Sequence, residues 1–485
     1  AADPYQITDW LELNQVRQFP AASFRLANDL DASSRGYDLL VKAGETLANG
    51  GLGWLPIEDE TGDTPAGFTG HFDGQGHSIH GLIARNPDRD RQGLFGWLAN
   101  GGLIENLGVV EVDIEGDRWV GGLVARSEGV VRNTFATGAL SGNQWIGGLV
   151  GRSFGGTIES SFAIATVTGG TEAGGLVGEN RSNATISNSF SSGIVSGTNF
   201  VGGLVGDHSS TIPITNSYSL AAVEGDRWVG GLAGFVGPGS TIQRSYAAGA
   251  VTGDDDVGGL VGQSRGTVQS SFYDNQTSGQ SDAGRGLART SDLLQLQSTF
   301  EGEGWDFDEV WALTDSSGGF VSYPFLRDFD YEDIATLTGD TAIPGFTEKL
   351  FASGAGTVDS PFIIESWSQL NNVRQALWAA FRLEADLTPA QADYKDVASA
   401  SAQDDRGMTP IGRSGDTPEP FTGQFDGNSH SIQGVVIRRD DSDDVGLFGF
   451  IEGAVISDLF LLDVDIEGSS RTGGLVGHAV DSTLT

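Results

Sequence analysis

Histidine imidazoles are common zinc ligands, and half of the histidines of this sequence lie close together. The three fall within ten residues: His71, His77 and His80. A second copy of the segment tests this cluster, because "FTGHFDGQGHSIHGL" (68–82) matches "FTGQFDGNSHSIQGV" (421–435). The copy keeps one histidine and replaces two: His430, Gln424 and Gln433. We therefore predict surface or packing histidines, with a metal site as the lesser alternative.

Carboxylates could serve a polysaccharide-active enzyme, and the chain carries 65 Asp and Glu residues. A glycosidase would need two of them across one groove, and a lyase would need a calcium-held set beside a basic residue. The two densest acidic runs, "GDDDV" (253–257) and "RRDDSDD" (438–444), are expected in solvated turns or loops. No repeat unit carries a long insertion of mixed Asp, Arg and His that would form a cleft. The sequence thus predicts no catalytic residue and no cofactor, apart from calcium bound loosely at acidic turns.

Large aromatic residues recur at one turn of the sequence, just before a "GGLVG" motif. The third residue after the opening glycine of this turn is, in successive units, Trp119, Trp145, Glu172, Phe200, Trp228 and Asp256. Two interpretations fit: the rings fold over a corner and seal the core, or they form an exposed ladder on which sugar rings or a neighbouring fibre stack. The candidate binding residues of the second interpretation are Trp119, Trp145, Phe200 and Trp228.

Positioning these side chains requires a repeated element, and the sequence has one. "EGDRWVGGLVA" (115–125) is nearly repeated as "EGDRWVGGLAG" (224–234), and the Gly-Leu pair of the motif recurs every 26 to 29 residues between Gly93 and Leu260. Each unit also repeats an aliphatic, a hydroxyl and an aromatic residue in the same order. A fixed period of this length is typical of solenoids.

The repeated segments are too short and too rich in Val, Ile, Thr and Gly to form helices. Apolar residues nine positions apart, Ile158, Val167 and Leu176, indicate three short strands per unit with these side chains inside. Strands with one apolar face must stack on those of the next unit, about 4.8 Å away. We predict an all-β fold, a parallel β-solenoid of about 27–28 residues per coil. Its glycines take tight corners that need positive φ or close backbone contact.

A longer repeat divides the chain into tandem modules. "PYQITDWLELNQVRQ" (4–18) matches "PFIIESWSQLNNVRQ" (361–375), and the tryptophans of these segments, Trp10 and Trp367, are expected to cover a first coil. The predicted parts are N-terminal capping coils at 1–67, solenoid coils at 68–272, a C-terminal capping segment at 273–329, an acidic joint at 330–357 and a partial second solenoid module at 358–485. Because the second module stops soon after its "GGLVG", we expect a piece of a longer tandem array.

Composition limits the setting and the partners. The 485 residues include 73 Gly and no Cys, and the net charge is −38, which repels nucleic acid and keeps a long fibre soluble. The sequence contains no run of 18 apolar residues and no signal-peptide pattern. The chain is therefore either cytosolic or a trimmed part of an exported protein, and we favour the second.

These motifs resemble the GLUG-motif repeats of large bacterial surface proteins. The likeness rests on the "GGLVG" units, the "FDGxGHSIxGL" segment and the closing "YDNQTSGQSDAGRGLART…WDFDEVWAL…YPFL" (273–326), and it covers most of the chain. The resemblance implies a right-handed parallel β-helix, export and a cell-surface setting. Proteins with such repeats include filamentous adhesins and the non-catalytic regions of some secreted proteases.

Our leading hypothesis is a structural or adhesive segment of a bacterial cell-surface or extracellular fibre, and not an enzyme. Its expected partners are glycans, a host or neighbouring cell surface, or other copies of itself, and nucleic acid is not among them. The alternatives are a polysaccharide-active β-helix enzyme, either lyase or hydrolase, and the non-catalytic stalk of a secreted protease. An ice- or mineral-binding solenoid would need a flat threonine ladder, and the hydroxyl column here is nearly all serine.

Overall fold

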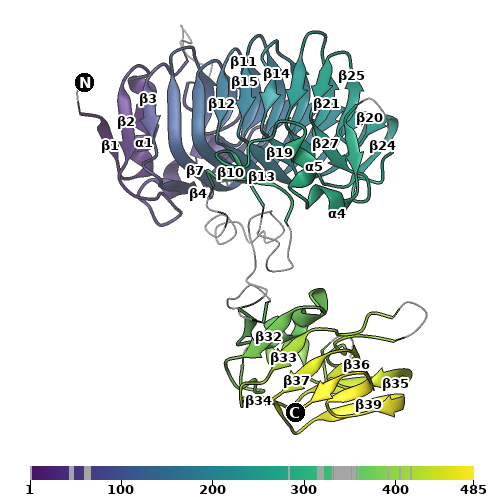
Figure 1. The fold of residues 1–485 in the computed structure, drawn as a ribbon. Helices are drawn as coiled ribbons and strands as arrows, with labels where there is room; N and C mark the ends of the chain where they lie inside the picture. The colour runs from purple at the N-terminus through teal and green to yellow at the C-terminus, as the bar shows by residue number, and fades with distance from the viewer. Residues whose placement is uncertain are drawn as a thin grey trace. The chain divides into compact units, whose positions relative to one another are not determined.

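The computed structural model describes residues 3–42, 48–58, 67–281, 285–313, 322–329, 331, 351, 357–358, 360–391, 393–402, 406–414 and 418–485. The chain divides into two compact units, made mainly of residues 1–313 and 347–485. Each unit is a parallel β-solenoid (Figure 1). Most of the predicted joint at 330–357 lies outside the described residues.

The coils of the first unit stack equivalent strands into two large sheets. The longest strands of the first sheet are β7 (Leu103–Glu115), β10 (Val130–Gly147), β13 (Phe162–Gly174), β16 (Phe190–Gly202), β20 (Ala222–Gly230) and β24 (Val251–Gly258). The second sheet contains β6 (Phe95–Leu98), β9 (Val124–Ser127), β11 (Val150–Phe154), β14 (Val177–Arg181), β17 (Val205–Ser209), β21 (Ala233–Val236) and β25 (Val261–Ser264). Shorter strands complete the coils: β8 (Arg118–Gly121), β12 (Thr157–Glu159), β15 (Thr185–Ser187), β18 (Ile214–Thr215), β19 (Tyr218–Ser219), β22 (Thr241–Gln243), β23 (Tyr246–Ala247), β26 (Thr267–Gln269) and β27 (Phe272–Asp274).

The strand register confirms the predicted solenoid. Ile158 pairs with Val131 of the preceding coil and with Ile186 of the next one, and both pairings are parallel. Ile158, Val167 and Leu176 are fully buried, as predicted. The middle strand of this unit, β13, is longer than expected, because its hydrogen-bonded ladder continues around the corner to Gly174.

The hydroxyl column lies inside the protein and links each coil to the next. Ser217 Oγ accepts a hydrogen bond from the backbone N–H of Ser189 at 3.3 Å and donates to the carbonyl of Thr215 at 2.9 Å. The same pair of bonds recurs at Ser189 and Ser245, and all three serines are fully buried. Buried polar atoms must be paired, so this column is an internal hydrogen-bonded ladder.

The paired glycines of the "GGLVG" motifs are needed for close contact between coils. Gly148 and Gly175 both lie outside the positive-φ region. A Cβ at Gly148 would lie 2.1 Å from the carbonyl oxygen of Gly175, and a Cβ at Gly175 would lie 2.0 Å from that of Gly203. Of the two predicted reasons for these glycines, the structure therefore selects backbone proximity.

Both units begin with the same capping segment, which confirms the prediction for the two tryptophans. Trp10 in α1 (Trp10–Gln15) and Trp367 in α7 (Trp367–Asn372) are fully buried. Their indole N–H groups donate to the carbonyls of Asp31 and Thr388 at 2.9 and 3.0 Å. The other elements of the first cap and opening coils are β1 (Tyr5–Ile7), η1 (Val16–Gln18), β2 (Ser23–Leu26), α2 (Tyr37–Leu40), α3 (Ala48–Gly51), β3 (His71–Asp73), β4 (Ser78–His80) and β5 (Ile83–Arg85).

The aromatic column forms a second hydrophobic cluster, separate from the solenoid core. Its rings stack with centroids 4.8 to 5.0 Å apart: Phe135, Phe162, Phe190, Tyr218 and Tyr246. β28 (Leu287–Arg289) first extends the parallel ladder beyond β27. The following segment then covers these rings with α4 (Ser291–Leu294), α5 (Ser298–Glu301), β29 (Trp311–Ala312) and β30 (Phe325–Leu326). The Tyr331 hydroxyl lies 3.0 Å from that of Tyr218. The segment predicted as a cap thus runs back along the side of the coils (Figure 1).

The second unit repeats the arrangement over fewer coils. Its elements are β31 (Phe362–Ile364), α7, η3 (Val373–Gln375), β32 (Ala380–Leu383), α8 (Tyr394–Val397), β33 (Gln424–Asp426), β34 (Ser431–Gln433), β35 (Val436–Val445), β36 (Phe448–Glu452), β37 (Val455–Ser457), β38 (Phe460–Leu462), β39 (Asp465–Thr472), β40 (Val476–Val480) and β41 (Thr483–Leu484). Within the described part of the chain, no helix has the length and apolar character that crossing a bilayer requires.

Candidate functional site

The aromatic turn predicted from the sequence is a column of residues at one corner of the first unit. We call it the corner column; it consists of Arg91, Trp119, Trp145, Glu172, Phe200, Trp228 and Asp256. All seven residues have left-handed backbone conformations, with φ between 51° and 61°. This conformation costs energy for a residue with a side chain, and it persists only where the surrounding structure enforces it. Here the strands on both sides of the corner are held in register with the next coil.

Two of the predicted binding residues, Trp119 and Trp145, stack on each other. Their ring centroids are 5.2 Å apart with an angle of 8° between the planes. Guanidinium groups occupy further positions over the rings: the Arg118 and Arg91 carbons lie 5.1 and 5.4 Å from Trp119, and that of Arg152 lies 5.0 Å from Trp145. Cation–π contact and ring stacking both stabilise this arrangement. The faces of both rings are therefore in contact with other side chains of the protein.

The other two predicted binding residues form a second aromatic group. Phe200 and Trp228 have centroids 4.3 Å apart, and Phe235 packs against both at 5.7 and 6.1 Å. The guanidinium carbon of Arg227 lies 4.3 Å from the Trp228 ring. All four rings of the predicted ladder are half-buried. The structure thus brings them together as two pairs, with Glu172 between the pairs.

A mixed ionic cluster fills the gap between the aromatic pairs. Glu179 and Asp207 lie near Glu172 and are only 1% and 8% exposed. Glu179 forms ion pairs with Arg152 and, at 2.8 Å, with Arg181. Burial raises the pKa of Asp207 to about 6, against a hydrogen bond from Ser209 that lowers it. Burial also raises the pKa of Glu172.

The ionic cluster combines features that acid–base catalysis uses, namely carboxyl groups whose surroundings separate their protonation states. Catalysis also requires that the substrate reach these groups. The low exposure of Glu179 and Asp207 prevents a polysaccharide chain from touching them. We therefore interpret Glu179 and Asp207 as buried members of a structural ion-pair network.

Sequence analysis missed this cluster, although a signal was present. The residues that directly follow three successive "GGLVG" motifs lie beside the corner column: Arg152, Glu179 and Asp207. Along these three coils the residue at this position changes from basic to acidic. Comparing the charge at that position from coil to coil would have located the cluster.

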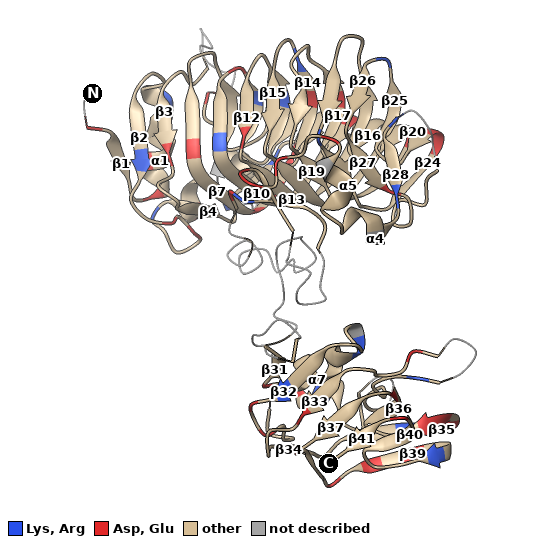
Figure 2. Cartoon of the chain, in the orientation of Figure 1, with Lys and Arg blue, Asp and Glu red and all other residues tan. Residues whose placement is uncertain are grey.

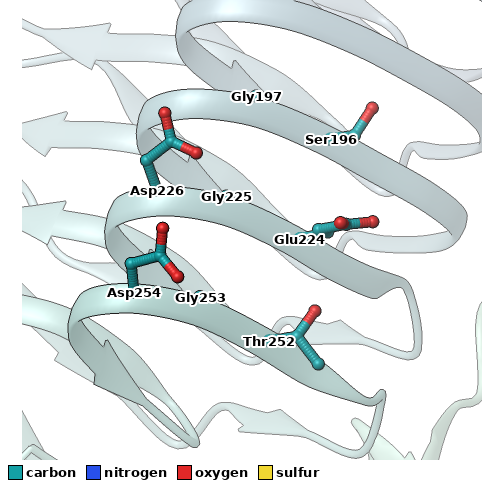
Figure 3. Close-up of a pocket in the computed structure, with 8 residues that line it drawn as sticks. All are labelled: Ser196, Gly197, Glu224, Gly225, Asp226, Thr252, Gly253 and Asp254. Carbon is teal, nitrogen blue, oxygen red and sulfur yellow. The ribbon is translucent and has the colours of Figure 1, made fainter.

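An acidic groove lies beside the corner column on β16, β20 and β24. It has a volume of about 480 Å³ and is lined by Ser196, Gly197, Glu224, Gly225, Asp226, Thr252, Gly253 and Asp254. The Asp226 and Asp254 side chains project from successive coils at the same edge (Figure 3). These carboxylates do not converge on one point as a compact metal site would. Loose calcium binding at this groove stays a prediction.

The two acidic runs lie in strands, which corrects the prediction of turns or loops. "GDDDV" belongs to β24 and "RRDDSDD" to β35, both of which show red acidic segments in Figure 2. Backbone pairing with a neighbouring coil, for example Arg227 with Asp255, keeps these runs in the ladder, although each run also turns at a left-handed residue, Asp256 or Asp444. Asp444 is 3% exposed and pairs with Arg471, so it is not a solvated loop residue.

The three clustered histidines do not converge on a common metal position. His77 Nδ1 lies 3.1 Å from Asp29, and His71 Nε2 lies 2.6 Å from Glu105 Oε1. Among the described residues, one group of potential metal ligands lies within 4.8 Å of one another: His71, Asp73 and Glu105. The sequence alone did not reveal this group, because Glu105 belongs to the next coil.

Comparison with known proteins gives partial matches. No protein-family model matches the chain, so the resemblance to GLUG-motif repeats stays a prediction. The chain is 35% identical to halomucin of Haloquadratum walsbyi over 141 residues, which are 28% of this chain and 1% of halomucin. It is 50% identical over 52 residues to a protein of Evansella cellulosilytica described as a Gly-rich membrane protein, covering 11% of this chain and 6% of that protein. The chain therefore spans a small fraction of either relative.

A solved structure gives a further comparison. It is that of a Bacteroides ovatus protein described as an immunoglobulin A1 protease, with a TM-score of 0.44 and 18% sequence identity. The match covers 67% of this chain and 93% of that one.

Proposed function

We propose that this chain is a structural and adhesive segment of a cell-surface or secreted fibre, and that it is not an enzyme. The observation that carries the proposal is the continuous register from β10 to β24 of the first unit, in which core, serine and corner residues form ladders from coil to coil. Such a solenoid is stiff along its axis and presents the same surface repeatedly. The names of the two partial relatives, which refer to a mucin and a membrane protein, support a surface or secreted setting.

The corner column is the surface that we propose for contact with partners. Its half-buried rings lie beside the exposed carboxylates of Asp226 and Asp254. Because the ring faces stack on each other and under guanidinium groups, a partner would contact ring edges and the polar atoms beside them. The acidic surroundings disfavour polyanions, so neutral glycans or another copy of the fibre fit this surface better.

The attachment test uses the full chain coupled to beads. Replacing Trp119, Trp145 and Trp228 by Ala should lower binding to neutral glycan arrays, to cells or to other copies of the chain. A matched control is Trp378→Ala, which removes a 57% exposed tryptophan of the second unit. Lost attachment in the triple variant, with normal attachment in the control, supports the proposal. Unchanged attachment together with a sharply lowered unfolding temperature would instead show that the rings seal the core and that the chain is a passive stalk.

The enzymatic alternative is tested separately. Incubation of the chain with pectin, alginate and similar acidic polysaccharides should release no reducing ends and no unsaturated products. Turnover that a single Asp or Glu substitution abolishes would replace the fibre proposal by a polysaccharide-active enzyme.

A further inference from the structure

We propose that His71, Asp73 and Glu105 form a binding site for a transition-metal ion of the zinc type. The site goes beyond the proposed fibre function and lies in the first coils of the first unit. Its residues come from two neighbouring parallel strands, β3 and β7, in which Asp73 is directly opposite Glu105. His71 and Asp73 are two residues apart on β3 and therefore project from the same face of the sheet. Phe72 between them is fully buried, so this face points away from the core.

The distances suit a small cation. One ligand atom from each residue lies within 4.8 Å of the other two, and His71 Nε2 is already 2.6 Å from Glu105 Oε1. Zinc binds imidazole nitrogen and carboxylate oxygen at about 2.0 to 2.2 Å, which places tetrahedral ligands roughly 3.4 Å apart. Displacements of the ligand atoms by about 1 Å would bring all three into zinc-binding distance. Water would supply the remaining position, as at other three-residue zinc sites.

The charges of the site also favour a cation. Asp73 and Glu105 carry like charges at directly opposed positions of adjacent strands, which repel each other. Arg132 offsets this repulsion on the Glu105 side, and a bound cation between the two carboxylates would lower it further. A metal ion would join the two carboxylates and replace the direct contact between His71 and Glu105.

Residues around the site hold its ligands in place. Arg132 donates to Glu105 Oε2 at 2.7 Å, which leaves Oε1 directed at His71. Asn106 donates to Asp73 Oδ1 at 3.0 Å. Such outer contacts fix the orientation of metal ligands and strengthen binding. Gln75 also contacts Asp73, and its exposed side chain would move aside when the ion binds.

The second unit supplies an internal control on the same scaffold. There β33 and β37 pair as β3 and β7 do, with Asp426 opposite Ser457. Gln424, Asp426 and Ser457 thus stand in place of the three ligands, and only the aspartate is kept. Zinc chemistry therefore predicts binding at this position of the first unit and none at the equivalent position of the second. The soft imidazole donor favours zinc over calcium, which prefers sites built of oxygen alone.

The experiment measures zinc binding to the untagged full chain by equilibrium dialysis and calorimetry. We expect about one Zn²⁺ per chain, released protons on binding, and at least about tenfold weaker binding in His71→Gln. His80→Gln is the matched control, because it also introduces the residue of the second unit but lies outside the cluster; it should bind zinc normally. The combined change Gln424→His and Ser457→Glu should raise the stoichiometry to two.

Three results would overturn the proposal. The first is the absence of saturable zinc binding. The second is equal binding by wild type and His71→Gln, and the third is displacement of zinc by an equal concentration of calcium. Because Gln is the natural residue at this strand position in the second unit, His71→Gln is compatible with the fold. The gain of a second site by the two changes in the other unit gives an independent check.

Discussion

The buried carboxyl group of Asp207 allows a quantitative prediction. Its pKa is raised by burial from the ordinary value of 3.8 to about 6, so at pH 7.5 the folded state holds an ionised group at an unfavourable place. The difference between these values corresponds to about 3 kcal/mol of folding free energy. Below pH 3.8 the group is neutral in both the folded and unfolded states, and the cost disappears. Asp207→Asn should therefore stabilise the coil at pH 7.5 by up to about 3 kcal/mol and change it little at pH 4.

The neighbouring His208 titrates in the opposite sense. Burial lowers its pKa from 6.5 to about 4, against a hydrogen bond with the carbonyl of Thr241 that raises it. The stability contributed by neutral His208 is present above pH 6.5 and is lost as the pH falls through 4, again by about 3 kcal/mol. In the wild type the protonation of Asp207 offsets this loss over the same range. In Asp207→Asn the offset is absent, so the coil should become acid-labile.

Hydrogen exchange of β17, read by mass spectrometry, is the suitable assay because solenoid coils open locally. Comparing variant and wild type at the same pH, we expect about 100-fold slower exchange in Asp207→Asn at pH 7.5 and nearly equal rates at pH 4. The exposed Asp226→Asn is the control and should change stability by less than about 0.5 kcal/mol. A variant-to-wild-type ratio that is the same at both pH values would refute the reasoning, as would faster exchange in the variant at pH 7.5.

Three further changes test the ladders that hold the coils together. Ser217→Ala leaves the backbone N–H of Ser189 without its acceptor, so the unfolding free energy should fall by about 1 to 3 kcal/mol. Thermal denaturation measures this loss, and an unchanged melting temperature would contradict the role of the serine ladder. Gly175→Ala places a methyl group against the carbonyl oxygen of Gly203 and should abolish the folded state or its long-range order. The loss should be visible as a reduced strand signal in circular dichroism. Normal folding of this variant would show instead that the coils can separate locally. Tyr331→Ala removes the hydroxyl contact with Tyr218. Proteolytic release of the C-terminal segment should become faster, and binding of a hydrophobic dye should increase. Resistance to proteolysis equal to that of the wild type would argue against the covering role of the C-terminal segment.

Much of the fold could be predicted from the sequence because repetition removes most alternatives. A unit of fixed length with one apolar face must stack on its copies, so the burial of Ile158, Val167 and Leu176 followed from their spacing. The same logic placed Trp10 and Trp367 in equivalent caps, since the chain repeats the whole segment around them. The position of a residue within a coil follows from the repeated order of apolar, hydroxyl and aromatic residues, which the sequence shows directly.

Contacts between coils were decided only by the tertiary structure. The sequence did not show that the left-handed corner belongs to residues such as Trp119 while the paired glycines serve backbone contact. It also did not show that the faces of Trp119 and Trp145 are engaged. These features depend on side-chain directions and on neighbours one coil away, and a list of apolar and polar positions does not contain them.

The candidate sites have the same origin. His71 and Glu105 meet because two strands separated by one coil lie in register, and Asp207 has its unusual pKa because the neighbouring coils exclude water from it. The sequence supplied the residues and the period that stacks them. Distances, burial and charge neighbours arise only when the coils are stacked, because each of them depends on at least two coils at once.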